Sequence, residues 1–138
     1  MLHEVKVQYK TRNDDGNEVT KKDWYIVDNC NLFCEVEHKV FKNFNYDTIK
    51  DFDVTDIKRS RIKEVANTRS SDNEKMFMAE VKDTFTTDDG VEKEIKYKVV
   101  FFSTDIDKAL SFIIEYMEQG YDMSLIGLKK TKYVDLLQ

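Results

Sequence analysis

Residues 4–31 read EVKVQYKTRNDDGNEVTKKDWYIVDNCN, and residues 80–105 read EVKDTFTTDDGVEKEIKYKVVFFSTD. When the two stretches are aligned, Gly16 falls on Gly90, Tyr25 on Val99 and Asn31 on Asp105. The first stretch then has two extra residues before its turn. An insertion of an even number of residues leaves the side chains of a strand on their original faces. We therefore interpret the chain as an internal duplication.

Each copy is expected to read strand, turn, strand, helix and strand. Alternating apolar residues predict the first strands, at Val5, Val7 and Tyr9 in one copy and at Phe77, Ala79, Val81 and Phe85 in the other. The segments NDDGN (13–17) and TDDGV (87–91) are typical of hairpin turns, in which glycine supplies a positive φ. The segments WYIVD (24–28) and YKVVFF (97–102) are apolar on both faces, which is typical of inner strands.

A helix is expected after each hairpin, with Asn31 and Asp105 as the N-cap residues. Both helices carry an apolar stripe that needs a sheet to cover it. The stripes consist of Phe33, Val36, Val40, Phe41 and Phe44, and of Ala109, Leu110, Ile113, Ile114 and Met117.

The third strand of each copy begins apolar and becomes basic. IKRSRIKEV (57–65) overlays LKKTKYVDL (128–136), which places Lys58 on Lys129, Arg59 on Lys130 and Arg61 on Lys132. The polar segment 66–75 is interpreted as a linker between the copies. We predict one α+β domain over residues 1–138, built from repeat 3–65 and repeat 76–137. The expected architecture is a mixed sheet with two helices on one face and a pseudo-twofold relation.

Composition points to a soluble protein of the cytoplasm. Of the 138 residues, 41% are hydrophobic and 12% aromatic, which is enough for a core, and the net charge is −5. No apolar run approaches the ~18 residues of a membrane span, and the start of the chain lacks the apolar region of a signal peptide. Two cysteines do not form a disulfide framework, which fits a reducing compartment.

The chain resembles a domain-of-unknown-function family that is widespread in Bacteroides-type bacteria and their phages. The resemblance lies in a first strand that leads to an acidic turn with glycine, in WYIVD (24–28), and in FDVTDIKRSRIKEV (52–65). The first helix departs from the family pattern, because CNLFCEVEHKVFKNF (30–44) stands where a small, acidic, Ala-rich helix is usual. The resemblance implies no established function. The scarcity of residues with GC-rich codons favours a phage genome, and a phage protein would act in the host cytoplasm or in the virion.

Motifs for catalysis and metal binding do not stand out. Cys30, Cys34 and His38 are four residues apart, but the outer two would lie about 12 Å apart along a helix, too far to share one zinc ion. We expect packed thiols and a surface histidine. The acidic turns lack the spacing of a calcium loop, and no nucleophile elbow, phosphate-binding glycine loop or HExxH is found. We therefore expect a protein that is not an enzyme and that has no cofactor and no metal.

The repeated basic segment is the candidate binding feature. Its side chains would track phosphates and offer a ring for base stacking, although lysine on such a strand equally serves to discourage edge-to-edge pairing. The candidate nucleic-acid-binding residues are Lys58, Arg59, Arg61, Lys63, Lys129, Lys130, Lys132 and Tyr133. The partner would be single-stranded DNA or RNA. The alternatives are a virion assembly adaptor and an inhibitor of a host protein or defence signal, with phage or host proteins as partners; a homo-oligomer is left open.

Overall fold

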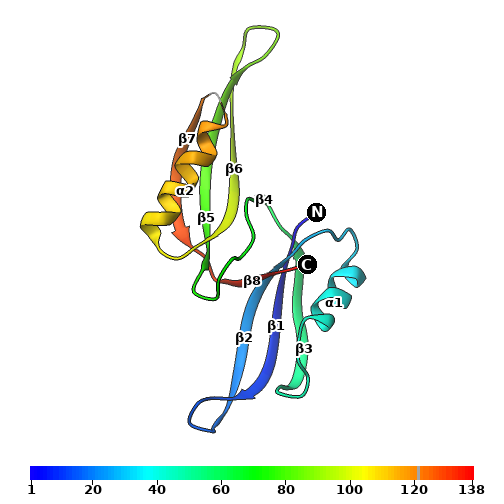
Figure 1. Cartoon of the computed structure of the whole chain (residues 1–138). Coiled ribbons are helices and arrows are strands. Elements are labelled where there is room, and N and C mark those ends of the chain that lie inside the picture. The colour runs from blue at the N-terminus through cyan, green and yellow to red at the C-terminus, as the bar shows by residue number, and fades with distance from the viewer. Residues whose placement is uncertain (121) are drawn as a thin grey trace. The chain divides into compact units, whose positions relative to one another are not determined.

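The computed structural model describes residues 1–120 and 122–138 (Figure 1). Its elements within these residues are β1 (His3–Arg12), β2 (Glu18–Val27), α1 (Phe33–Lys42), β3 (Lys50–Arg59), β4 (Ile62–Val65), β5 (Lys75–Thr86), β6 (Glu92–Ser103), α2 (Ile106–Glu118), β7 (Met123–Lys130) and β8 (Tyr133–Leu137). The α+β class predicted from the sequence is confirmed.

The chain divides into two compact units. Unit 1 comprises Met1–Ser60 and Lys132–Gln138, and unit 2 comprises Arg61–Thr131. Each unit contains one four-stranded mixed sheet and one helix. The prediction of a single sheet with two helices on one face is therefore wrong. The predicted repeats 3–65 and 76–137 also do not coincide with the units, because both boundaries fall inside the basic segments.

The sheet of unit 1 has the strand order β3-β1-β2-β8. Strands β1 and β2 form an antiparallel hairpin, β3 pairs antiparallel with β1, and β8 pairs parallel with β2. The hairpin turn follows the prediction: Gly16 has a φ of 80°, and Asn13 Oδ1 accepts hydrogen bonds from the backbone N–H groups of Asp15 and Asn17. The turn residues thus set the register of β1 and β2.

The sheet of unit 2 has the order β4-β6-β5-β7 and the same pattern of directions. The β5–β6 hairpin is antiparallel, β7 pairs antiparallel with β5, and β4 pairs parallel with β6. Gly90 has a φ of 80° in the turn. The two units therefore share the spatial order and the directions of their strands, whereas the duplication itself stays a prediction.

The fourth strand of each sheet comes from the other half of the sequence. Strand β4 follows β3 along the chain but pairs in unit 2, and β8 follows β7 but pairs in unit 1. The predicted third strands are therefore each broken in two, at Ser60–Arg61 and at Thr131–Lys132. At these breaks the N–H of Ser60 donates to the Leu2 carbonyl and the N–H of Thr131 donates to the Met76 carbonyl.

The cross-strand partners also correct the sequence alignment. Val5 pairs with Tyr25, and Ala79 pairs with Val99. Since Tyr25 corresponds to Val99, Val5 corresponds to Ala79, and the two hairpins match without any insertion. The prediction of a two-residue insertion before the first turn is therefore wrong.

Each helix covers one face of its sheet. In unit 1, Val36 and Val40 of α1 pack in a buried cluster with Val5, Val27 and Leu137. In unit 2, Ala109 and Ile113 of α2 pack in a cluster with Phe77, Ala79, Val81 and Phe101. The predicted stripes are wider than the covered surface, because Phe33, Phe41, Leu110 and Ile114 are exposed.

The predicted helix caps have different outcomes. Asp105 is the N-cap of α2, where its Oδ1 accepts a hydrogen bond from the N–H of Lys108 at 2.8 Å. The prediction for Asn31 is wrong, because α1 begins after Leu32, whose side chain makes no cap hydrogen bond. The N–H of Asn31 instead donates to the Glu35 carboxylate at 3.1 Å. The Glu35 carboxylate in the first turn of the helix thus accepts a hydrogen bond from the backbone of the preceding loop, whereas the side chain of Asn31 does not cap the helix.

Candidate nucleic-acid-binding surface

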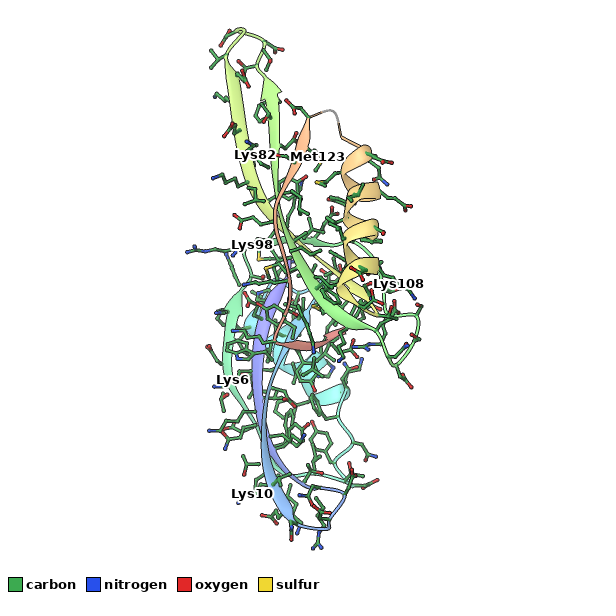
Figure 2. All side chains as sticks on the ribbon, turned by 90° about the vertical axis from the view of Figure 1, so that its left-hand side faces the viewer. Lys6, Lys10, Lys82, Lys98, Lys108 and Met123 are labelled. Carbon is green, nitrogen blue, oxygen red and sulfur yellow. The ribbon has the colours of Figure 1, made fainter. Side chains whose placement is uncertain are left out.

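One face of the sheet of unit 1 packs against α1, and part of the opposite face carries charge. Val5, Val7 and Tyr25 belong to the core cluster on the side of α1. Successive side chains of a strand point to opposite faces, so Lys6 and Trp24 lie on the face away from α1. These two residues are also cross-strand partners in the β1–β2 hairpin; Lys6 is labelled in Figure 2.

Three lysine ammonium groups surround the indole of Trp24. The Nζ atoms lie 4.3 Å (Lys132), 5.1 Å (Lys58) and 6.0 Å (Lys6) from the ring centroid. These distances fall within the ~6 Å at which a cation is attracted to an aromatic face. The lysines come from β1, from β3 and from the residue before β8. Strand β8, which follows unit 2 in the sequence but pairs in unit 1 and which we call the exchanged strand, is therefore needed to assemble them. We call Lys6, Trp24, Lys58, Lys132 and Tyr133 the Trp24 patch.

Tyr133 fixes the exchanged strand beside Trp24. The two residues are register partners between β8 and β2, and Lys132 Nζ lies 5.9 Å from the Tyr133 ring centroid. The Tyr133 hydroxyl donates a hydrogen bond to the carboxylate of Glu4 on β1. Burial and the adjacent Glu4 raise the pKa of Tyr133 well above its ordinary value. The hydroxyl is therefore protonated at neutral pH and remains a donor.

The charged ends of the patch are accessible. Lys58 and Lys132 are exposed, and Lys6, Trp24 and Tyr133 are half-buried. The acidic neighbours are Glu4, which Tyr133 engages, and Asp56, the register partner of Lys6 on β3. The patch thus offers three cationic groups around an aromatic surface, an arrangement that can contact phosphates and stack on a base.

The structure brings together three of the eight predicted residues, namely Lys58, Lys132 and Tyr133. Arg59 also lies in unit 1, but as the register partner of His3, so it points to the other face of the sheet. The remaining four residues, Arg61, Lys63, Lys129 and Lys130, belong to unit 2. Each of the two basic segments, 57–65 and 128–136, is therefore divided between the units.

The predicted residues of unit 2 have separate environments. Lys63 Nζ lies 3.9 Å above the ring centroid of Tyr97. Lys129 borders a pocket of about 280 Å³ together with Lys98. Lys130 lies close to Lys75, and this second ammonium group lowers the pKa of Lys130. Arg61 is exposed at the start of the unit.

Sequence reasoning missed Trp24 and Lys6. Trp24 was included in a strand expected to be apolar on both faces, so its outward position gave no signal. Lys6 was part of an ordinary alternating strand. The cross-strand pairing of position 6 with position 24, which follows from a hairpin centred on residues 13–17, was the available signal.

The cysteines and histidines have distinct surroundings. Cys30 is buried in the core of unit 1, as expected, but Cys34 is exposed, so the prediction that both thiols pack is wrong for Cys34. His38 is exposed on α1, as predicted. Within residues 1–120 and 122–138, no group of three or more His, Cys, Asp or Glu side chains is arranged to hold a metal ion.

The chain belongs to the family described as "Domain of unknown function (DUF4494)", which matches residues 1–138. Membership of a family without an assigned function is thereby confirmed, and its occurrence in Bacteroides-type bacteria and phages stays a prediction. Comparisons with curated proteins and with solved structures found no match. In the described part of the chain, neither helix has the length and apolar character to cross a membrane.

Proposed function

We propose that the protein is a non-enzymatic binding protein for single-stranded nucleic acid and that the Trp24 patch is its contact surface. The observation that carries the proposal is the convergence of three ammonium groups on one indole ring, from parts of the chain up to 126 residues apart. Proteins that bind single strands without sequence preference combine positive charge for the backbone with rings for the bases. The acidic net charge of −5 does not oppose this role, because the positive charge is local.

The proposal differs from the sequence hypothesis in its residues. Arg59 lies on the opposite face of the sheet, so Lys6 takes its place beside Lys58 and Lys132. Three phosphate contacts on a single strand give a slope of about −2 for log affinity against log salt, at about −0.7 for each contact. The affinity should then fall roughly 15-fold between 50 and 200 mM salt.

The test measures fluorescence anisotropy of labelled oligothymidylate and oligouridylate at several salt concentrations. The double variant Lys58→Ser, Lys132→Ser should weaken binding and reduce the slope to about −0.7. The matched control is Lys21→Ser, Lys42→Ser, which makes the same change in net charge. Both control lysines are exposed; Lys21 lies on the α1 side of the sheet and Lys42 lies in the last turn of α1. The control should bind as the wild type does.

Trp24 provides a direct readout, because it is the one tryptophan of the chain. Stacking of a base on the indole should change its emission, and the change should saturate with the anisotropy signal. Absence of binding at ~50 mM salt, or equal weakening in the control variant, would overturn the proposal. The assembly-adaptor and inhibitor hypotheses would then take precedence.

A further inference from the structure

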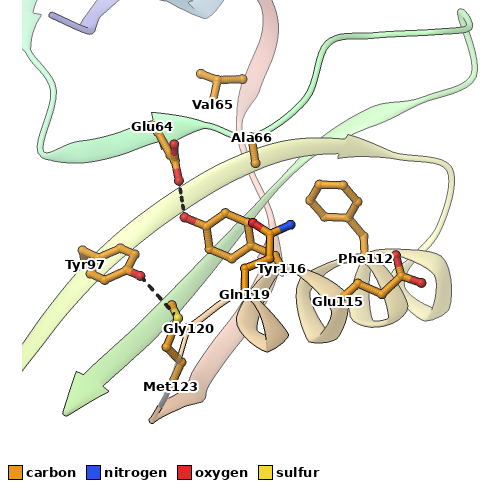
Figure 3. A pocket seen from close by; sticks show the side chains of 10 residues that line it. All are labelled: Glu64, Val65, Ala66, Tyr97, Phe112, Glu115, Tyr116, Gln119, Gly120 and Met123. Atoms are coloured by element: carbon orange, nitrogen blue, oxygen red, sulfur yellow. Dashed lines mark hydrogen bonds between the residues drawn. The ribbon is translucent and has the colours of Figure 1, made fainter. Parts of the chain in front are cut away.

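Unit 2 contains a pocket on the side of its sheet that α2 covers. The pocket has a volume of about 490 Å³, within the range of ~300–1,000 Å³ that is usual for small-molecule sites. It lies between the second half of α2, strand β4, strand β6 and the first residue of β7 (Figure 3). Every residue that lines it belongs to unit 2.

The lining combines aromatic rings with negative charge. Phe112, Tyr116 and Tyr97 contribute rings, and Glu64 and Glu115 contribute carboxylates. Among the described residues, no lysine, arginine or histidine lines the pocket. Aromatic faces and carboxylates both favour a positive ion, and the carboxylates would repel a phosphate or a carboxylate ligand.

Glu64 is held in position by the wall of the pocket. The Tyr116 hydroxyl donates a hydrogen bond to Glu64 Oε1. A carboxylate has about four acceptor positions, so this bond orients Glu64 and leaves it able to accept from a ligand. Burial and then the Glu64 carboxylate raise the pKa of Tyr116 well above its ordinary value, which keeps the hydroxyl protonated as a donor.

One aromatic ring of the pocket wall already contacts an ammonium group of the chain. Lys63, which is adjacent to Glu64, places its Nζ 3.9 Å above the ring centroid of Tyr97. The Tyr97 hydroxyl in turn lies 3.9 Å from the sulfur of Met123, which lines the same end of the pocket (Figure 3). The Tyr97 ring is therefore able to accept an ammonium group, and the charge of Lys63, which does not itself line the pocket, would repel a cation bound nearby.

We propose that this pocket binds a small organic ammonium ion, such as an alkylamine or a polyamine, with its charge near one of the lining carboxylates, Glu64 or Glu115, and its alkyl chain against the rings. The site is independent of the Trp24 patch, which lies in unit 1. The proposal predicts opposite signs for two kinds of variant. Removing a carboxylate should weaken amine binding, whereas removing the Lys63 ammonium should strengthen it.

The experiment titrates the full chain, labelled with ¹³C at methionine methyl groups, with 1,5-diaminopentane and spermidine. The Met123 signal, assigned with Met123→Leu, should shift and saturate. 1-Pentanol serves as the neutral control of similar shape and should produce a much smaller shift. The amide of Nα-acetyl-lysine tests whether a lysine side chain is an equally good source of the ammonium group.

Glu115→Gln should weaken diamine binding roughly tenfold, as expected for loss of one charged hydrogen-bond acceptor. Glu115 is exposed, so this variant should fold normally. Glu64→Gln retains an oxygen that can accept from Tyr116 and should act in the same direction. Lys63→Ser should increase the affinity for the diamine. Equal shifts with pentanol, or weaker binding in Lys63→Ser, would overturn the proposal.

Discussion

Leu137 tests the assignment of the exchanged strand to unit 1. Its side chain is 7% exposed and packs in the core cluster that also contains Val27 and Val36. Its carbonyl accepts a hydrogen bond from the N–H of Asp28, and its backbone register partner is Val27. Leu137→Ala therefore removes apolar volume from the core of unit 1, although the residue follows unit 2 in the sequence.

The expected loss can be estimated from burial. Truncation of a buried leucine to alanine costs about 2–5 kcal/mol, and a site near the end of an edge strand can partly collapse, so we expect about 3 kcal/mol. With a dependence on urea of about 2 kcal/mol per molar, the unfolding midpoint should fall by roughly 1.5 M.

The assay is urea unfolding followed by the fluorescence of Trp24, which lies on β2 and reports on unit 1. Leu137→Met should cost less than about 1.5 kcal/mol, because it nearly conserves volume. Val134→Ala is the matched truncation on the same strand at a side chain that is 43% exposed, and it should change the midpoint little. An unchanged Trp24 transition in Leu137→Ala would refute the pairing of β8 with β2.

Three further predictions concern single side chains. Burial, followed by the charge of Arg59, lowers the pKa of His3 below 6.5, so the unfolded chain binds a proton that the folded chain excludes. Stability in urea titrations should therefore fall as the pH drops below about 6.5, and His3→Phe, which introduces the residue type of the corresponding position 77, should abolish this dependence. Asp105→Ala should lower the free energy of unfolding by about 1 kcal/mol through loss of the α2 cap, whereas Asn31→Ala should be nearly neutral. A thiol reagent should label Cys34 rapidly in the native protein and Cys30 only after unfolding, as peptide mass analysis would show; equal labelling would contradict their different burial.

Local features were predictable because they depend on short stretches of sequence. Gly16 and Gly90 marked the hairpin turns, and Asp105 marked the start of α2. The two-residue offset in the alignment was not detectable from alternation, because an even shift leaves every side chain on the same face. The cross-strand pair Val5–Tyr25 was needed to correct it.

The pairing of β4 and β8 could not be predicted from the pattern. Alternation indicates that residues 62–65 and 133–137 are extended, but it does not identify the strand with which they pair. The basic residues between them and the preceding strands were therefore assigned to continuous strands. The same limit hid the Trp24 patch, since Lys132 reaches Trp24 only because β8 joins the sheet of unit 1.

The exchange of strands has a consequence for the order in which the protein matures during synthesis. Domains generally fold as they emerge from the ribosome, beginning at the amino-terminal end. Here the sheet of unit 1 lacks β8 until residues 133–137 have been translated, whereas unit 2 has all four of its strands once β7 is made. The unit that begins first is therefore completed second. Until then the backbone N–H and C=O groups at the edge of β2 are unpaired. A ribosome-associated chaperone or a second nascent chain could pair with this edge.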